Sequence, residues 1–244
     1  MSLPRLYRDL ALWWPPLSHP DEYADEAAWI FGALKESLGR PPGTILELGS
    51  GGGNTASHLT PHARLTLVDL SAEMLAVSRF LNPLAEHVEG DMRAVRLGRL
   101  FDAVLIHDAI MYMTAERDLV AALATARAHL GASGVAIVLP DCTAESFAPG
   151  VDSGGRDAAD GRGVRYLEWS RAPAVGATSF EVDYAILLRA PDGTVEAVLD
   201  RHQCGLFPRR VWRSAFGEAG FGAPLLRTDP WGRDVFVARP APAR

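Results

Sequence analysis

The sequence has little cysteine: Cys142 and Cys204 are the only two in 244 residues, and they match no metal-binding spacing. Two cysteines are also too few for a disulfide framework, so we expect a reduced, cytoplasmic protein. The sequence contains no basic N-terminal region followed by an apolar run, and no apolar stretch long enough to span a bilayer. These absences argue against secretion and against membrane insertion.

Runs of basic residues are also absent, and the formal net charge is −6. A protein that follows a phosphate backbone normally presents a basic face, so we expect no nucleic-acid partner. Asp141 could bind a metal ion, but no second and third ligand accompany it, and we expect no metal.

Short apolar segments alternate with helical ones through the first half of the chain. This alternation predicts an α/β fold, a Rossmann-like doubly wound sheet with helices on both faces. The predicted strands span 44–48, 65–68, 86–89, 101–106 and 135–139, and the predicted helices span 54–59, 71–80 and 115–130, the last ended by Gly131.

A different pattern follows the fifth strand. Residues 149–163 are rich in Gly and Asp and predict a mobile loop, and three β-like runs follow at 164–169, 180–188 and 195–204. We therefore predict an N-terminal helical lid (1–40), a Rossmann-like domain (41–141 and 206–240) and an inserted antiparallel β cap (142–205). The lid helix is predicted to start near Pro20, where Ser18 and Asp21 have capping-box spacing.

A glycine-rich turn, ELGSGGG, follows the first strand and precedes a helix. Glycine permits positive φ and a close approach of a ligand to the backbone. By itself this turn is equally compatible with a nicotinamide-nucleotide site or with a tight strand-to-helix connection.

Three carboxylates sharpen the prediction. Glu47, Asp69 and Asp91 each lie near the carboxyl end of one of the first three strands, at intervals of 22 residues. Ligands of doubly wound sheets bind at this edge. A carboxylate after the second strand can accept both hydroxyls of a ribose, and Asp91 is placed to accept from an exocyclic amine. Three acids suit a cationic adenosine ligand better than a pyrophosphate.

The motifs ELGSGGG, VDLS and EGDM resemble the successive motifs of class I S-adenosylmethionine-dependent methyltransferases, over about residues 44–141. The resemblance implies that Glu47 and Gly49 lie near the methionine amino group, that Asp69 holds the ribose, and that Asp91 and Met92 frame the adenine. The other cofactor-binding residues predicted are Ser50, Gly51, Asn54, Thr55, Leu70, Met74, Arg93, His107 and Asp108.

The acceptor is expected beyond the fourth strand, where the sequence is LIHDAIMYM. In this fold that edge faces the methyl group, so His107 and Tyr112 are candidate catalytic residues and Tyr112 a candidate substrate contact. The Asn/Asp-Pro-Pro-aromatic motif of nucleic-acid amino-methyltransferases is absent. A base is needed only if the nucleophile arrives protonated.

The late segment resembles the inserted sheet and following helix of small-molecule N-methyltransferases, including those that methylate amino groups of nucleotide-linked sugars. That resemblance implies an acceptor-binding role for Arg201 and Arg233 and a catalytic role for His202. Tyr112 stands where this subfamily carries a histidine. Alternatively, His202 is a structural histidine and Arg233 an ion-pair partner.

Tyr7, Trp14 and Tyr23 are predicted to bind substrate as part of a lid; the alternative is a helix that packs its aromatic side on the sheet. The sequence thus predicts a methyltransferase that uses S-adenosyl-L-methionine, with S-adenosyl-L-homocysteine as product, on a small-molecule acceptor, most simply an amine. The alternatives are a NAD-dependent oxidoreductase and a cofactor-binding pseudoenzyme. A homodimer is compatible with the sequence.

Overall fold

A computed structural model describes residues 3–242. The chain forms a mixed seven-stranded sheet and a separate four-stranded antiparallel sheet, which confirms the predicted fold class. The larger sheet has the order β10-β11-β5-β4-β1-β2-β3. Its strands are β1 (Thr44–Leu48), β2 (Arg64–Asp69), β3 (Glu86–Glu89), β4 (Phe101–His107), β5 (Leu130–Leu139), β10 (Leu225–Thr228) and β11 (Asp234–Ala238).

The strand order reverses between β1 and β4. β1 pairs in parallel with both β2 and β4, whereas β11 runs antiparallel to β5. A crevice at the carboxyl ends of the strands is expected at such a reversal, because the connections from β1 and β4 leave in opposite directions. The glycine turn and the LIHDAIMYM segment follow these two strands.

Helices cover both faces of the larger sheet. Ile45 and Leu105 face α2 (Ala24–Leu38) and α3 (Asn54–Leu59), and Leu46 and Val104 face α5 (Glu116–Ala128) and α6 (Arg209–Glu218). Alternate residues of one strand therefore enter two different apolar layers, which explains why these strands are apolar throughout. α4 (Ala72–Leu81) follows β2, and Ser71 caps it by accepting from the Met74 N–H.

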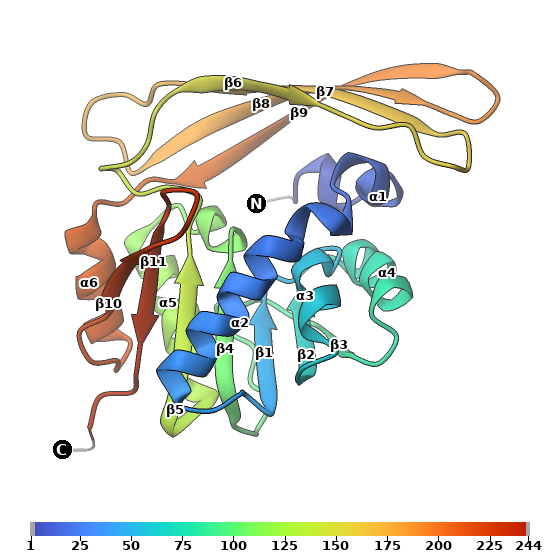
Figure 1. Ribbon diagram of the computed structural model, residues 1–244. Helices are drawn as coiled ribbons and strands as arrows, with labels where there is room; N and C mark the ends of the chain where they lie inside the picture. Colours follow the sequence, from blue (N-terminus) through green and yellow to red (C-terminus); the bar gives the residue numbers. More distant parts are fainter. Residues whose placement is uncertain (1–2, 243–244) are drawn as a thin grey trace.

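The smaller sheet comprises β6 (Gly150–Gly154), β7 (Gly163–Ser170), β8 (Ser179–Arg189) and β9 (Val195–Gly205). It lies across the carboxyl ends of the parallel strands (Figure 1). Short N-terminal turns fill the space beneath it: η1 (Arg5–Tyr7), η2 (Ala11–Trp13), α1 (Trp14–Leu17) and η3 (Pro20–Tyr23). Leu6 and Leu10 from these turns pack with Val164, Ile186 and Val198 of the smaller sheet.

Three local predictions were wrong. The segment predicted as a mobile loop contains β6, because its backbone pairs with residues 166–170 although its side chains are mostly exposed. α5 ends at Ala128, and Gly131 lies within β5, where Leu130 pairs with Phe101 across an irregularity. Ser18 caps no helix: it bonds Tyr23 and Asn54, and the His19 side chain accepts from the Asp21 N–H.

Two further searches concern the described part of the chain. No helix within residues 3–242 is long and apolar enough to cross a membrane. Over the same residues, no group of three or more His, Cys, Asp or Glu side chains is arranged to hold a metal ion.

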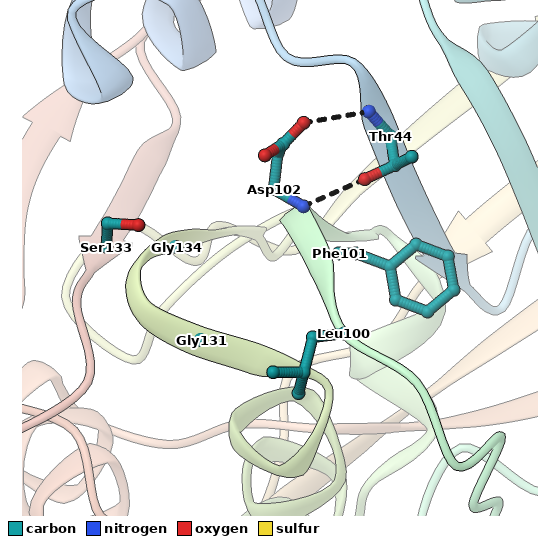
Figure 2. A pocket seen from close by; sticks show the side chains of 7 residues that line it. All are labelled: Thr44, Leu100, Phe101, Asp102, Gly131, Ser133 and Gly134. Carbon is teal, nitrogen blue, oxygen red and sulfur yellow. Dashed lines mark hydrogen bonds between the residues drawn. The ribbon is translucent and has the colours of Figure 1, made fainter.

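A hollow lies at the opposite, amino-terminal edge of the larger sheet, and hydrogen bonds join two of the residues that line it (Figure 2). Asp102 accepts from the Thr44 N–H at 3.0 Å, and the Asp102 N–H donates to Thr44 Oγ1 at 3.0 Å. Arg40 also pairs with the Asp102 carboxylate. These contacts hold the starts of β1 and β4 together, so the polar groups at this edge have a structural role.

Candidate active site at the carboxyl edge of the sheet

The glycine turn brings the backbone close to its surroundings. Gly49 has a φ of 78°, and a Cβ placed on it would lie 2.3 Å from Ala109 Cβ and 2.7 Å from Met92 Cε. No other residue type fits there without moving one of these neighbours. The turn therefore packs closely against the residues that follow β4 and against the loop that carries Met92.

Asp69, at the end of β2, is fixed by two backbone donors. Its carboxylate accepts from the Gly51 N–H at 2.7 Å and from the Ser71 N–H at 2.9 Å. Burial nevertheless raises the pKa of Asp69, because the two backbone hydrogen bonds only partly replace lost water. The carboxylate is held rigidly beside the turn and keeps lone pairs for further donors.

Glu47 is almost fully buried at the end of β1, and its Oε2 atom has no hydrogen-bond partner. Burial raises the pKa of Glu47 to about 8. Ser50 Oγ, in the turn that follows, is a second buried polar atom without a partner. Buried polar groups are normally satisfied, so these two atoms indicate a place for a polar, cationic ligand group.

The third predicted acid lies in a different environment. Asp91 is partly exposed and paired with the Arg93 guanidinium, which lowers the pKa of the Asp91 carboxyl. Met92 lies against Gly49, and the fully buried Met74 approaches Gly51. Leu70 is half-exposed beside them. Met92 and Met74 therefore lie against the glycine turn itself.

Charged side chains gather where β4 ends. His107 Nε2 lies 3.2 Å from Glu26 of α2 and 3.1 Å from Asp108, and its Nδ1 lies 3.4 Å from Thr55 Oγ1. Arg233 is bonded to Glu26 and Asp229. Burial opposes ionisation of Glu26, but His107 and Arg233 outweigh it and hold the pKa of Glu26 at about 2.

Asp108 and Asp141 follow the ends of the neighbouring strands β4 and β5. Both side chains reach solvent, yet the surrounding protein raises the pKa of Asp108 to about 6 and that of Asp141 well above its usual range. These carboxyl groups lie at the carboxyl ends of adjacent strands, where a cleft is expected in this fold. Asp108 also has a φ of 34°, a strained value for a residue with a side chain.

An aromatic group lies above these carboxyls. Tyr112, in η4 (Ala109–Tyr112), bonds the Tyr7 hydroxyl at 2.8 Å and His202 Nδ1 at 2.8 Å. His202 Nε2 lies 3.1 Å from Asp200 on the same strand, β9. The tyrosines are partly accessible, whereas His202 is 2% exposed.

The remaining predicted residues divide into two groups. Trp14 packs on Gly52 of the glycine turn, and Tyr23 bonds Ser18, which in turn contacts Asn54. Arg201 lies on the opposite face of β9 from His202 and pairs with Asp183. The structure therefore brings the N-terminal aromatics to the turn and leaves Arg201 on the outer surface.

Four participants were absent from the sequence prediction of the site. Glu26 contacts both His107 and Arg233, Asp229 contacts Arg233, Asp200 contacts His202, and Asp141 lies beside Asp108. Asp200 could have been found, because residues two apart on a strand share a face. Glu26 gave no such signal, since an acidic residue in the first turn of a helix is ordinary.

The comparisons with known proteins agree with this geometry. A family model described as a methyltransferase domain matches residues 45–134. The chain is 33% identical over 221 residues to dTDP-3-amino-3,6-dideoxy-alpha-D-glucopyranose N,N-dimethyltransferase of Streptomyces fradiae, covering 90% of this chain and 85% of the relative. A second relative, dTDP-3-amino-3,4,6-trideoxy-alpha-D-glucopyranose N,N-dimethyltransferase of Streptomyces venezuelae, is 33% identical over 92% of this chain and 94% of its own. The chain belongs to the S-adenosylmethionine-dependent methyltransferases.

A solved structure supports the same cofactor for this methyltransferase. The S-adenosylmethionine-bound amino pentose methyltransferase CalS10 from Micromonospora echinaspora superimposes with a TM-score of 0.77 at 25% identity, covering 90% of this chain and 92% of that one. S-adenosyl-L-methionine is the cofactor, and nothing in the comparisons supports the nicotinamide alternative or the pseudoenzyme. When bound, its sulfonium supplies an activated methyl group.

The residues of the methyltransferase fit this cofactor. The unpartnered Glu47 and Ser50 oxygens suit an ammonium and its neighbouring polar atoms, and the backbone-held Asp69 suits a ribose diol. The partly buried Met92 offers apolar surface to a base, whereas Met74 is fully buried beneath the turn. Each of these assignments remains a prediction of contact.

Proposed function

We propose that this methyltransferase methylates the amino group of a 3-amino sugar carried on a nucleoside diphosphate. The observation that carries the proposal is the extent of the similarity. Both relatives named for dTDP-3-amino sugars match at least 90% of the chain, so the match includes β6–β9 as well as the cofactor domain. The second sheet covers the cleft, and its similarity supports a similar acceptor.

The cleft supports an amine in particular. The carboxyls of Asp108 and Asp141 offer hydrogen-bond partners to an amino group, and the linked Tyr7 and Tyr112 add hydroxyls near Asp141. Holding two reactants in line can supply about 7–11 kcal/mol of the barrier, without any covalent intermediate. We propose that His107 organises the floor of the cleft, and that His202 acts on the acceptor side.

The assignment of the three segments is part of this proposal. Residues 1–40 act as the lid, 41–141 with 206–240 bind the cofactor, and 142–205 cover the acceptor. The ion-paired Arg233 contacts the acceptor through its remaining guanidinium face. The net charge of −6 supports a small-molecule acceptor over nucleic acid, and the two free cysteines support a cytoplasmic location.

We also propose a homodimer formed through the outer face of the four-stranded sheet. Leu167, Leu187 and Leu199 lie on that face at 47%, 49% and 80% exposure. They are grouped around one shallow apolar hollow, as expected of a face that packs on another sheet. A second copy would cover this face and leave the cleft open.

The acceptor is tested by incubating the protein with S-adenosylmethionine and dTDP-3-amino-3,6-dideoxy-α-D-glucose, followed by mass spectrometry. We expect the addition of one or two methyl groups to the sugar nitrogen. The matched control is the same sugar nucleotide with a 3-hydroxyl, which should gain none. Saturable cofactor binding without methylation of the amino sugar would refute the acceptor and leave the cofactor assignment intact.

A further inference from the structure

Four side chains form one continuous hydrogen-bonded chain across the cleft. Tyr7 bonds Tyr112, Tyr112 bonds His202, and His202 bonds Asp200, with oxygen–oxygen or nitrogen–oxygen distances of 2.8, 2.8 and 3.1 Å. Three different parts of the sequence contribute to it: the N-terminal turn, η4 and β9. His202 and Asp200 are buried at its inner end, at 2% and 9% exposure.

The direction of each hydrogen bond in this chain can be derived from the charge on Asp200, at its inner end. Burial opposes ionisation of Asp200, but hydrogen bonds from His202 and the Leu6 N–H lower the pKa of its carboxyl. An ionised carboxylate only accepts, so His202 Nε2 carries the proton and Nδ1 is left as an acceptor. Tyr112 then donates to Nδ1, and Tyr7 donates to Tyr112.

The outer end of the chain, the Tyr7 hydroxyl, lies on the side of Asp69 and Asp141. Asp69 and Asp141 lie near enough to the Tyr7 hydroxyl for their charges to raise its pKa, after the larger effect of burial. Ser71, two residues after Asp69, donates its hydroxyl to the Tyr7 carbonyl at 2.5 Å. Because Tyr7 donates inward to Tyr112, its oxygen keeps lone pairs for a donor in the cleft.

Few other titratable groups face His202. The Tyr184 ring of β8 is tilted against the imidazole, with centroids 4.8 Å apart, and the Tyr7 and Tyr112 rings lie at 5.5 and 6.0 Å. Burial raises the pKa of the Tyr7, Tyr112 and Tyr184 hydroxyls, so all three stay neutral. Cys204 lies two residues along the same face, and Arg5 lies near Asp200. Asp200 is the carboxylate that contacts the imidazole.

We propose that His202, oriented by Asp200, accepts the proton that the methylated amine must lose, through Tyr7 and Tyr112. This inference rests on the proposed amine acceptor. The acceptor attacks as the neutral amine, and as the nitrogen–carbon bond forms and the carbon–sulfur bond breaks, the nitrogen becomes cationic. It gives one proton to Tyr7, Tyr7 gives its own to Tyr112, and Tyr112 gives its own to Nδ1. The product is a neutral amine and an imidazolium beside Asp200.

Asp200 is a positioning residue in this scheme, because it acts through His202. The same Oδ2 atom accepts from the Leu6 N–H at 2.8 Å. One oxygen therefore fixes both the imidazole and the N-terminal turn that carries Tyr7. The Asp200 carboxylate therefore both holds the N-terminal turn in place and orients the His202 imidazole.

The kinetic test compares wild type with His202→Gln, Tyr112→Phe and Asp200→Asn under saturating S-adenosylmethionine and dTDP-3-amino-3,6-dideoxy-α-D-glucose. We expect kcat to fall on the order of 100-fold in the first two variants, the size of a general-base contribution, with KM nearly unchanged. Asp200→Asn should retain more activity and displace the acid limb of the kcat profile to lower pH. The control is Asp183→Asn, on the outer face of the same sheet, which should match wild type.

A spectroscopic readout is independent of the acceptor. Nitrogen-15 NMR of the histidines should show His202 of the wild type as a single Nε2–H tautomer, and Asp200→Asn should release it. S-adenosylhomocysteine binding by each variant establishes that it folds. A mixed tautomer in the wild type, or an unchanged kcat and pH profile in His202→Gln, would overturn the inference. If wild type does not methylate the amino sugar, the proposed acceptor fails, and the tautomer alone decides the positioning role.

Discussion

Neighbouring carboxylates at this site differ because their surroundings differ. Asp91 is paired with Arg93 and its pKa is lowered, whereas Glu47 is buried without an ion-pair partner and its pKa is raised to about 8. Glu26 is also buried, but His107 and Arg233 hold its pKa at about 2. The availability of a counter-ion, more than burial, therefore decides which carboxylate is ready to meet a cation.

Cofactor affinity should depend on pH through Glu47. Below pH 8 the free protein holds this carboxyl protonated, and an ammonium ligand favours the ionised form, so the affinity for S-adenosylhomocysteine should rise from pH 6.5 to 8. In the free protein the sign is opposite: the raised pKa contributes stability below about pH 4.5 that is lost as pH rises through 8. Calorimetry in two buffers of different ionisation enthalpy should detect proton release on binding at pH 7.

Glu47→Gln is the matched control for that titration. It should bind more weakly and lose the proton release that Glu47 causes. If wild type and Glu47→Gln show the same pH dependence, the ammonium contact assigned to Glu47 is wrong.

Asp69→Ala should weaken S-adenosylhomocysteine binding by about 2–3 kcal/mol, the strength of hydrogen bonds to a charged group. The change also removes the acceptor of the Gly51 and Ser71 N–H groups, so part of the loss comes from the turn itself. Glu89→Ala, at an exposed position at the end of the neighbouring β3, serves as the control for isothermal titration calorimetry. An unchanged dissociation constant in Asp69→Ala would contradict the ribose contact.

At the scale of elements, the N-terminal turns pack against the glycine turn. A Cβ on Gly52 would lie 2.4 Å from the Trp14 ring, so this position must stay small for Trp14 to pack there. The same N-terminal segment contacts Asp200 through Leu6 and Ser71 through Tyr7. The segment is therefore anchored to both sheets.

Gly52→Ala should displace Trp14 and loosen the N-terminal segment. Overpacking of this kind costs about 1–3 kcal/mol where the neighbours cannot move. We expect faster hydrogen exchange over residues 5–17 and weaker S-adenosylhomocysteine binding. Gly32→Ala, in α2, has open space around its Cβ position and should change neither. Unchanged exchange in Gly52→Ala would mean that Trp14 does not seat the segment.

At the scale of the whole molecule, we propose that the seven-stranded sheet binds the cofactor and that the four-stranded sheet covers the acceptor. The parallel strands deliver the glycine turn, Asp69 and Asp108 to one edge, and the four-stranded sheet lies across that edge (Figure 1). The inner face of the cover carries His202 and Asp200, and its outer face carries exposed leucines. Because successive side chains of β9 point to opposite faces, the candidate catalytic residues and the proposed association surface lie on different sides of the sheet.

Leu199→Glu should abolish the proposed homodimer, because it places a charge at the centre of the apolar face. Analytical ultracentrifugation should show a dimer for wild type and a monomer for the variant, with cofactor binding retained. Leu84→Glu, at an equally exposed leucine after α4, should stay dimeric. A monomeric wild type at micromolar concentration would remove the dimer proposal.

Local patterns in the sequence were enough to predict the parallel strands, the glycine turn and the acids after β1 and β2. Strands buried on both faces are apolar throughout, and a turn that approaches its neighbours requires glycine. Each of these features is therefore visible as a pattern of a few adjacent residues. The edge strand β6 left no such mark, because backbone pairing holds it and its side chains remain in solvent.

The sequence by itself determined the fold class, the cofactor motifs and their order along the chain. Only the tertiary structure decided the partners: that Glu26 and Asp229 neutralise Arg233, that Asp200 orients His202, and that Tyr7 reaches Tyr112 across 105 residues. It also decided that Arg201 points outward. The reason is physical: a strand or a turn is encoded by adjacent residues, whereas the charge state and role of a buried side chain depend on groups that only folding brings within hydrogen-bond distance.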